Sequence, residues 1–265
     1  MSNLVKLENI NRFNGFSELY NQSRPTPPAV IPQIVLRYLE SPPEIVVDLG
    51  CGTGLSTLIW RDFADTIIGI EPNDDMRGEA VKNITASNIT IKKGVSNNTE
   101  LPPNYADIIA VSQAFHWFDI DSTLAEVFRV LKAGGVFAVF DCDWPPTVDW
   151  RVEAAYNALQ RKCDKICNAE KNHAVRNDKS AYIQRFSDFG KFRFVKDIAC
   201  HSAETCNAER MKGIALSQGA VQDAMKLTPQ SGITSEIEAF CKLVDERCKG
   251  EFEIVFSYRL RIGKK

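Results

Sequence analysis

The chain has 265 residues, of which 44% are hydrophobic and 25% are charged, and its formal net charge is −2. This composition is ordinary for a folded protein and excludes extended disorder. The balanced charge disfavours a nucleic-acid-binding surface, and no apolar run reaches the ~18 to 20 residues that span a bilayer. We therefore expect a protein that binds neither nucleic acids nor membranes.

The start of the chain and its cysteines indicate the compartment. The first residues, "MSNLVKLENINRF", lack the apolar core of a signal peptide. Eight cysteines are scattered along the chain without the spacing of a disulfide framework. Both features predict a cytoplasmic protein with reduced thiols.

The first half of the chain alternates strand and helix patterns. An ordered leading segment precedes a helix that begins near Ala29, after several prolines. A buried strand is predicted at residues 44–50, and further short apolar strands are predicted at residues 66–71, 88–94, 106–112 and 135–141. Helical spacing joins Leu55, Leu58, Ile59 and Phe63, and later Leu124, Val127, Phe128 and Leu131. The alternation predicts an α/β fold with a doubly wound parallel sheet, whose ligand lies beyond the carboxyl ends of the strands.

The second half has a different pattern. Residues 142–190 show no strand signal, and a helical stripe there predicts an insertion or lid; the stripe consists of Val152, Tyr156, Leu159, Cys163 and Ile166. A strand is expected near residues 191–198 and helices at 208–226 and 234–248. The last strand alternates apolar and polar residues from Ile254 to Ile262, which is typical of an antiparallel strand. We expect one domain, divided into segments 1–40, 41–141, 142–190 and 191–265.

A glycine-rich turn follows the first strand. In "DLGCGTG" (48–54) glycine occupies every second position, which permits positive φ and close approach of a ligand to the backbone. A dinucleotide fingerprint would place its third glycine at position 55, where this chain has Leu55. Glu71 stands 21 residues after Gly50, at the end of the second strand, where a carboxylate can bind both hydroxyls of a ribose. The pattern favours an adenosine ligand without phosphate and leaves a nicotinamide dinucleotide open.

Four stretches resemble a known family. "VVDLGCGTG", "IIGIEPNDDM", "ADIIAVSQAFHWFD" and "RVLKAGGVFAVFD", in this order, are similar to the successive motifs of the class I S-adenosylmethionine-dependent methyltransferases. "FNGFSELYNQSRP" and "QAFHWF" resemble the small-molecule branch that includes the trans-aconitate methyltransferases. The resemblance implies a seven-stranded, mostly parallel, Rossmann-like sheet and S-adenosyl-L-methionine as cofactor. It also implies methyl transfer to a small acidic or polar metabolite as acceptor.

The same resemblance implies the site residues. The backbone of the glycine turn would meet the amino-acid part of the cofactor, Glu71 would bind the ribose, and the leading segment would fold over the cofactor. The expected cofactor-binding residues are Tyr20, Arg24, Asp48, Gly50, Cys51, Gly52, Glu71, Pro72, Asn73, Met76, Val95, Ser96, Gln113 and Ala114. The expected acceptor-binding residues are Tyr20, Arg24, His116 and Trp117.

The expected site departs from the family pattern at one position, and the need for a catalytic base stays open. Members often carry an acidic residue for the adenine amino group where this chain has Val95, so Ser96 or Asn97 must substitute or the contact is missing. Methyl transfer needs no base when the acceptor is a carboxylate, whereas for an amine or hydroxyl His116 is the candidate base. The alternative for His116 is a structural hydrogen bond.

Parts of the sequence are also compatible with other functions. Cys163, Cys167 and His173 have a spacing compatible with a metal, but Cys163 falls on the apolar stripe, so we expect core packing and no metal. A nucleotide-dependent oxidoreductase and a non-catalytic cofactor-binding protein share the fold and remain alternatives. The oligomeric state is left open.

Overall fold

The computed structural model describes residues 7–169, 176–227 and 232–265. Its centre is a seven-stranded sheet of order β3-β2-β1-β4-β5-β7-β6. The strands are β1 (Ile45–Leu49), β2 (Thr66–Ile70), β3 (Ile89–Lys92), β4 (Ala106–Ser112), β5 (Leu131–Cys142), β6 (Phe194–Cys206) and β7 (Phe252–Lys264). Strands β1 to β5 pair in parallel, and β7 is antiparallel to both β5 and β6. The predicted mostly parallel, seven-stranded sheet is confirmed.

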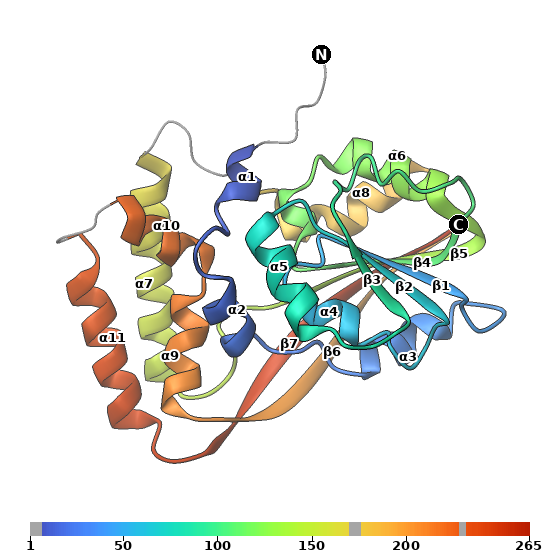
Figure 1. The fold of residues 1–265 in the computed structure, drawn as a ribbon. Helices are drawn as coiled ribbons and strands as arrows, with labels where there is room; N and C mark the ends of the chain where they lie inside the picture. Colours follow the sequence, from blue (N-terminus) through green and yellow to red (C-terminus); the bar gives the residue numbers. More distant parts are fainter. Residues whose placement is uncertain (1–6, 170–175, 228–231) are drawn as a thin grey trace.

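Helices cover both faces of the sheet (Figure 1). One face carries α6 (Ile120–Val130) and α8 (Tyr182–Phe189), and the other carries α3 (Val30–Leu36), α4 (Leu55–Leu58) and α5 (Asp74–Asn83). Consecutive strand residues therefore point into different cores: Val46 and Ile108 into one, Val47 and Ile109 into the other. Burial on both faces explains why these strands are continuously apolar in the sequence.

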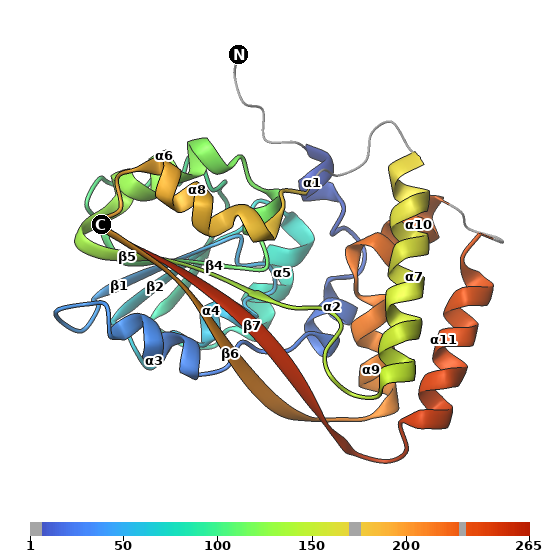
Figure 2. The same ribbon diagram turned by 180° about the vertical axis from the view of Figure 1, so that it is seen from behind.

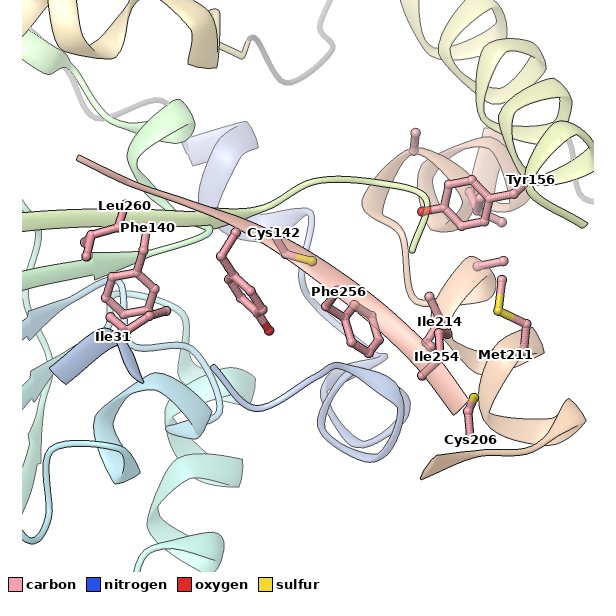
Figure 3. Packing of buried hydrophobic residues seen from close by; sticks show 14 of the residues in the cluster. Ile31, Phe140, Cys142, Tyr156, Cys206, Met211, Ile214, Ile254, Phe256 and Leu260 are labelled. Carbon is pink, nitrogen blue, oxygen red and sulfur yellow. The ribbon is translucent and has the colours of Figure 1, made fainter. Parts of the chain in front are cut away.

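A layer of helices lies beyond one end of the sheet. It consists of α7 (Trp150–Ala169), α9 (Ala208–Leu216), α10 (Gly219–Leu227) and α11 (Thr234–Arg247), and the long strands β6 and β7 extend beneath it (Figure 2). Helices α1 (Leu7–Asn11) and α2 (Ser17–Ser23) lie between this layer and the sheet. The core under α3 continues into the helical layer through Phe256 and Ile254 to Met211 (Figure 3). The layer is therefore part of the same folded body.

The segment 142–190, which we expected to be a helical insertion, packs against two different parts of the fold. Helix α7 packs against α10 and α11, whereas α8 returns to the sheet beside α6 and contacts β6 and β7. The buried stripe of α7 contains Cys167 in place of the expected Ile166. That this segment acts as a lid stays a prediction.

The first helix after the glycine turn is shorter than expected. Only Leu55–Leu58 is helical, and Leu55, Leu58 and Ile59 are half-buried. The fully buried face is instead formed by Thr57 and Trp60, because the Thr57 hydroxyl donates to a carboxylate beneath the turn. Leu131, which we expected at the end of a helix, is the first residue of β5.

Candidate cofactor-binding and active site

The glycine turn leaves the carboxyl end of β1 in a conformation that requires glycine. Gly50 has φ +68°, and a Cβ there would come within 2.8 Å of the Ala114 Cβ. Gly52 has φ +56° and borders a cavity, which a side chain would enter beside Met76. The N–H groups of Gly50 and Cys51 both donate to the Ile70 carbonyl at the end of β2. The turn is thus fixed to the neighbouring strand.

Asp48 lies under the turn and is completely buried. Its Oδ2 accepts hydrogen bonds from the hydroxyls of Ser56 and Thr57, each at 2.7 Å. Burial raises the pKa of Asp48 to about 6, and the two hydroxyl donors oppose that shift. Its contacts therefore connect the end of β1 to the first turn of α4, and Asp48 does not line the cavity.

Glu71 links the two parts of the site that follow β1 and β2. Its Oε2 accepts from the Gly52 N–H at 2.9 Å, and its Oε1 accepts from the Asn73 N–H at 2.8 Å. Burial raises its pKa to about 7 against the effect of these two donors. Each carboxylate oxygen has a second lone pair, so a ribose hydroxyl can still donate to it.

A cavity of about 320 Å³ opens at this edge of the sheet. It brings together most of the expected residues: Tyr20, Gly50, Gly52, Glu71, Pro72, Met76, Val95, Ser96, Gln113, Ala114 and Trp117. Asn73 does not line it; its amide Nδ2 donates to Ile10 and Asn14 in the leading segment, and its Oδ1 accepts from the Met76 N–H. Asn73 therefore ties the leading segment to the start of α5.

Val95 borders the cavity at the position where members of the family often carry an acidic residue. The Ser96 hydroxyl lies 2.9 Å from the Thr123 hydroxyl of α6 and so already has a partner. Asn97 borders the cavity and forms no side-chain hydrogen bond with the described residues. Of the two candidate substitutes for an acidic contact, Asn97 is the one with its amide oxygen available.

A second, smaller cavity of about 50 Å³ lies on the other side of the turn. Tyr20, Gly50, Gly52 and Gln113 border both cavities, and Cys51 and Arg24 border only this one. The Arg24 guanidinium lies over the rings of Tyr20 and Trp144, at 4.8 and 4.7 Å from their centroids. Its Nη2 donates to the Ser217 carbonyl and to Gln218 Oε1. Arg24 thus holds the leading segment against the helical layer.

Gln113 follows β4 and stands between the cavities. Its φ of +52° is rare for a residue other than glycine. Its N–H donates to the Phe140 carbonyl of β5, and its Oε1 accepts from Lys179 Nζ at 3.0 Å. Lys179 also pairs with the buried Asp141 at 2.9 Å. These contacts fix the orientation of the Gln113 amide at the point where the two cavities meet.

His116 is separated from both cavities. Its ring is buried, and its Nδ1 lies 4.0 Å from Asp141 Oδ1. Burial lowers the pKa of His116 well below its usual value, and Lys179 and Arg176 lower it further. The imidazole is neutral at physiological pH, and its role as a base stays a prediction.

Several residues that line the cavities are not among the expected site residues. Phe118 could have been included with Trp117, because it belongs to the same short motif and packs on Gly50. Ser112 ends β4 next to Gln113. Asn9, Ile10 and Phe13 of the leading segment, and Asn177 and Arg185 from near α8, reach the cavity only through the tertiary fold.

The structure also shows the state of the cysteines, the packing of the candidate metal ligands and the character of the helices. All eight cysteines are free thiols. Within residues 7–169, 176–227 and 232–265, no three His, Cys, Asp or Glu side chains gather as a metal-binding group, and Cys163 and Cys167 are packed in the core. His173 lies outside these ranges. No helix in the described residues combines the length and apolar character needed to cross a membrane.

Comparisons with known proteins agree with the geometry of segment 41–141, which contains the glycine turn and Glu71. Residues 47–139 match the family model described as "Methyltransferase domain". The protein CRG1 of Saccharomyces cerevisiae, described as an S-adenosylmethionine-dependent methyltransferase, is 26% identical over 136 residues, 49% of this chain and 47% of that protein. An uncharacterized methyltransferase of Synechocystis sp. is 29% identical over 116 residues, 40% of this chain and 54% of that protein. The chain spans about half the length of the curated relatives that it matches.

The fold has a counterpart among solved structures. A protein described as a type II methyltransferase from Anaeromyxobacter dehalogenans superimposes with a TM-score of 0.69 at 20% identity, covering 91% of this chain and 97% of that one. At this identity the likeness concerns the fold. Residues 47–139, which contain the glycine turn and Glu71, are thus similar to a methyltransferase domain, and the sheet order agrees with the fold of the structurally similar protein.

Proposed function

We propose that the protein transfers a methyl group from S-adenosylmethionine to a small acidic or polar acceptor. The observation that carries this proposal is the hydrogen bonding of the glycine turn. The N–H groups of Gly50, Cys51 and Gly52 all have partners inside the protein, on Ile70 and Glu71. A diphosphate needs such N–H groups as donors, whereas a nucleoside with an amino-acid tail needs the Glu71 carboxylate and a neutral surface. The turn therefore favours S-adenosylmethionine over a nicotinamide dinucleotide.

The residues divide the cofactor between the two cavities. Glu71 would accept from both ribose hydroxyls, and Met76 and Phe118 would enclose the adenine in the larger cavity. Asn97 would accept from the adenine amino group in place of the missing acidic residue. In the smaller cavity, the Arg24 guanidinium would neutralise the carboxylate of the amino-acid tail. Glu71 and Asn97 border the larger cavity, and Arg24 borders the smaller one.

The cofactor supplies an electrophilic methyl group on a positively charged sulfur. The protein's contribution is to hold the acceptor in line with that group and to exclude water. Gln113 and Tyr20, which border both cavities, stand at the junction where the two reactants would meet. The neutral His116 lies behind this junction, so we assign it a supporting role and assign no base to the reaction.

Calorimetry and a transfer assay test the proposal together. We expect S-adenosylmethionine and its demethylated product to bind with micromolar affinity, and NAD to bind at least about 100-fold more weakly. Label from the methyl group should then appear in a small acidic or polar compound when the protein is incubated with fractionated metabolite pools. Tighter binding of NAD would favour an oxidoreductase. Cofactor binding with no transfer to any pool would favour a non-catalytic binding protein.

A further inference from the structure

Lys179 borders neither cavity, yet it contacts Gln113, which borders both. Its ammonium group is held by a buried carboxylate: Lys179 Nζ lies 2.9 Å from Asp141 Oδ1, and Arg261 Nη1 lies 3.0 Å from Asp141 Oδ2. The Asp141 side chain is 1% exposed, whereas that of Lys179 is 32% exposed. The carboxylate therefore has one cation on each oxygen, and Lys179 is the cation that continues to the cavities through Gln113.

The backbone around Lys179 is fixed by contacts to the loop after β4. The Asn177 N–H donates to the His116 carbonyl at 2.8 Å, and its Nδ2 donates to the Phe118 carbonyl, also at 2.8 Å. Arg261 Nη2 donates to the Lys179 carbonyl at 3.4 Å. Lys179 is thus held through its backbone as well as through its ammonium group.

The Gln113 amide can take only one orientation against its neighbours. Lys179 Nζ lies 3.0 Å from one end of the amide, and this end must be the oxygen because an ammonium group can only donate hydrogen bonds. The other end, the amide nitrogen, lies 3.4 Å from the Cys142 carbonyl, which can only accept. The two contacts agree, so the donor end of the amide lies on the side of Cys142.

That side belongs to the smaller cavity. Cys142 borders the smaller cavity together with Gln113 and Arg24, and it is not among the residues that line the larger one. An amide nitrogen carries two N–H groups, and the long contact to the Cys142 carbonyl uses one of them. Within the described part of the chain the other N–H has no acceptor. An amide N–H beside a guanidinium in one small cavity matches a carboxylate.

We propose that Lys179 is a positioning residue for the cofactor. It holds the Gln113 amide so that an N–H group donates to the carboxylate of the amino-acid tail of S-adenosylmethionine, beside the Arg24 guanidinium. The inference rests on the proposed function, which assigns that tail to the smaller cavity. Without the ammonium group the amide can rotate about its last bond and turn its oxygen towards the carboxylate, which loses a donor and adds repulsion.

Calorimetry with two ligands that differ in the tail tests the proposal. S-adenosylhomocysteine carries the amino-acid tail, and methylthioadenosine has a methyl group in its place. Lys179→Met should weaken binding of S-adenosylhomocysteine about fivefold and that of methylthioadenosine less than about twofold, because only the first ligand has the carboxylate. Lys179→Arg keeps a cationic donor and should bind S-adenosylhomocysteine within about twofold of the wild type. Equal weakening of both ligands by Lys179→Met would contradict the proposal.

The matched control is Lys132→Met. Lys132 lies at the opposite end of β5 from Asp141, its side chain is 30% exposed, and it pairs with Glu44 at 2.9 Å and with Asp107 at 3.0 Å. The change removes the same kind of ion pair away from both cavities. Affinity for both ligands should stay that of the wild type. A loss as large as that of Lys179→Met would mean that the effect comes from lost ion pairing and not from the amide.

A double variant shows whether Lys179 acts through Gln113. Gln113→Met removes the amide and should weaken binding of S-adenosylhomocysteine about tenfold. Adding Lys179→Met to it should weaken binding no further, because two residues that act through one contact do not have additive effects. Additive losses would overturn the assignment.

Methylthioadenosine serves as the independent readout. Its binding uses the adenosine half of the site and shows that each variant is folded. If Lys179→Met does not fold, Lys179→Gln, which keeps a polar group beside Asp141, takes its place with the same expected loss. If the wild type binds neither ligand, the proposed function fails. If the wild type binds both and the Lys179 variant does not lose the tailed ligand selectively, only the assignment of Lys179 fails.

Discussion

The two sides of the glycine turn differ in how their polar atoms are paired. On the cofactor side, Asp48 and Glu71 receive hydrogen bonds from residues close in sequence, so the groups that would hold the adenosine are already fixed. On the helical side, the contacts join segments far apart in the sequence: Arg24 donates to the Ser217 carbonyl and to Gln218, and Arg12 pairs with Asp223. The comparison indicates that the groups around Glu71 are positioned by local contacts, whereas those on the helical side depend on the tertiary fold.

Removal of the Glu71 carboxylate should produce the largest effect on the cofactor side. Glu71→Ala deletes the acceptor for the ribose and also frees the Gly52 N–H, so the turn loses its fixed position. Two hydrogen bonds to a charged group are worth about 3 kcal/mol or more, hence we expect affinity for S-adenosylmethionine to fall about 100-fold or more in calorimetry.

The control for this variant is Asp74→Ala. Asp74 is an exposed carboxylate three residues further along, which pairs with Arg77 and Lys93 outside the cavity. It should keep wild-type affinity. Equal affinity of the Glu71 and Asp74 variants would mean that the adenosine does not bind at Glu71.

Asp48→Ala should lower the free energy of unfolding as well as the affinity for the cofactor. The change leaves the buried hydroxyls of Ser56 and Thr57 without their acceptor. Unsatisfied buried groups cost about 1–3 kcal/mol each, so we expect the free energy of unfolding to fall by roughly 2–4 kcal/mol in urea denaturation. Asp62→Ala, which breaks an exposed pair with Arg61, should leave the free energy of unfolding unchanged within the error of the measurement. A similar small change for both variants would show that Asp48 does not support the turn.

The same contrast explains what the sequence could predict. The strands β1, β2, β4 and β5 were predictable because burial on both faces makes them continuously apolar, and Glu71 was predictable from its distance to the turn. The short α4 was not, because its buried face is chosen by hydroxyl bonds to Asp48. The pairing of Arg12 with Asp223 had no signal, since the tertiary fold alone brings together residues 211 positions apart.

Arg24 lies at the border between the two regions and can show to which one it belongs. Its guanidinium is held by Gln218 and by the rings of Tyr20 and Trp144. If it neutralises the cofactor carboxylate, Arg24→Ala should weaken S-adenosylmethionine binding about tenfold, the value of a partly exposed charge-assisted contact. Arg24→Lys keeps the charge and should lose less. A larger rise in the acceptor's Michaelis constant than in the cofactor's dissociation constant would assign Arg24 to the acceptor side instead.

The smallest expected effect is a dependence of cofactor affinity on pH. Burial raises the pKa of Glu71 to about 7 in the free protein, and ribose hydroxyls donate to its ionised form. Binding then releases a proton at pH values below 7, so affinity should fall as the pH falls; from pH 8 to 6.5 the loss is about fourfold. Calorimetry at both pH values measures this change in affinity. A cofactor affinity independent of pH would mean that Glu71 is already ionised before the cofactor binds.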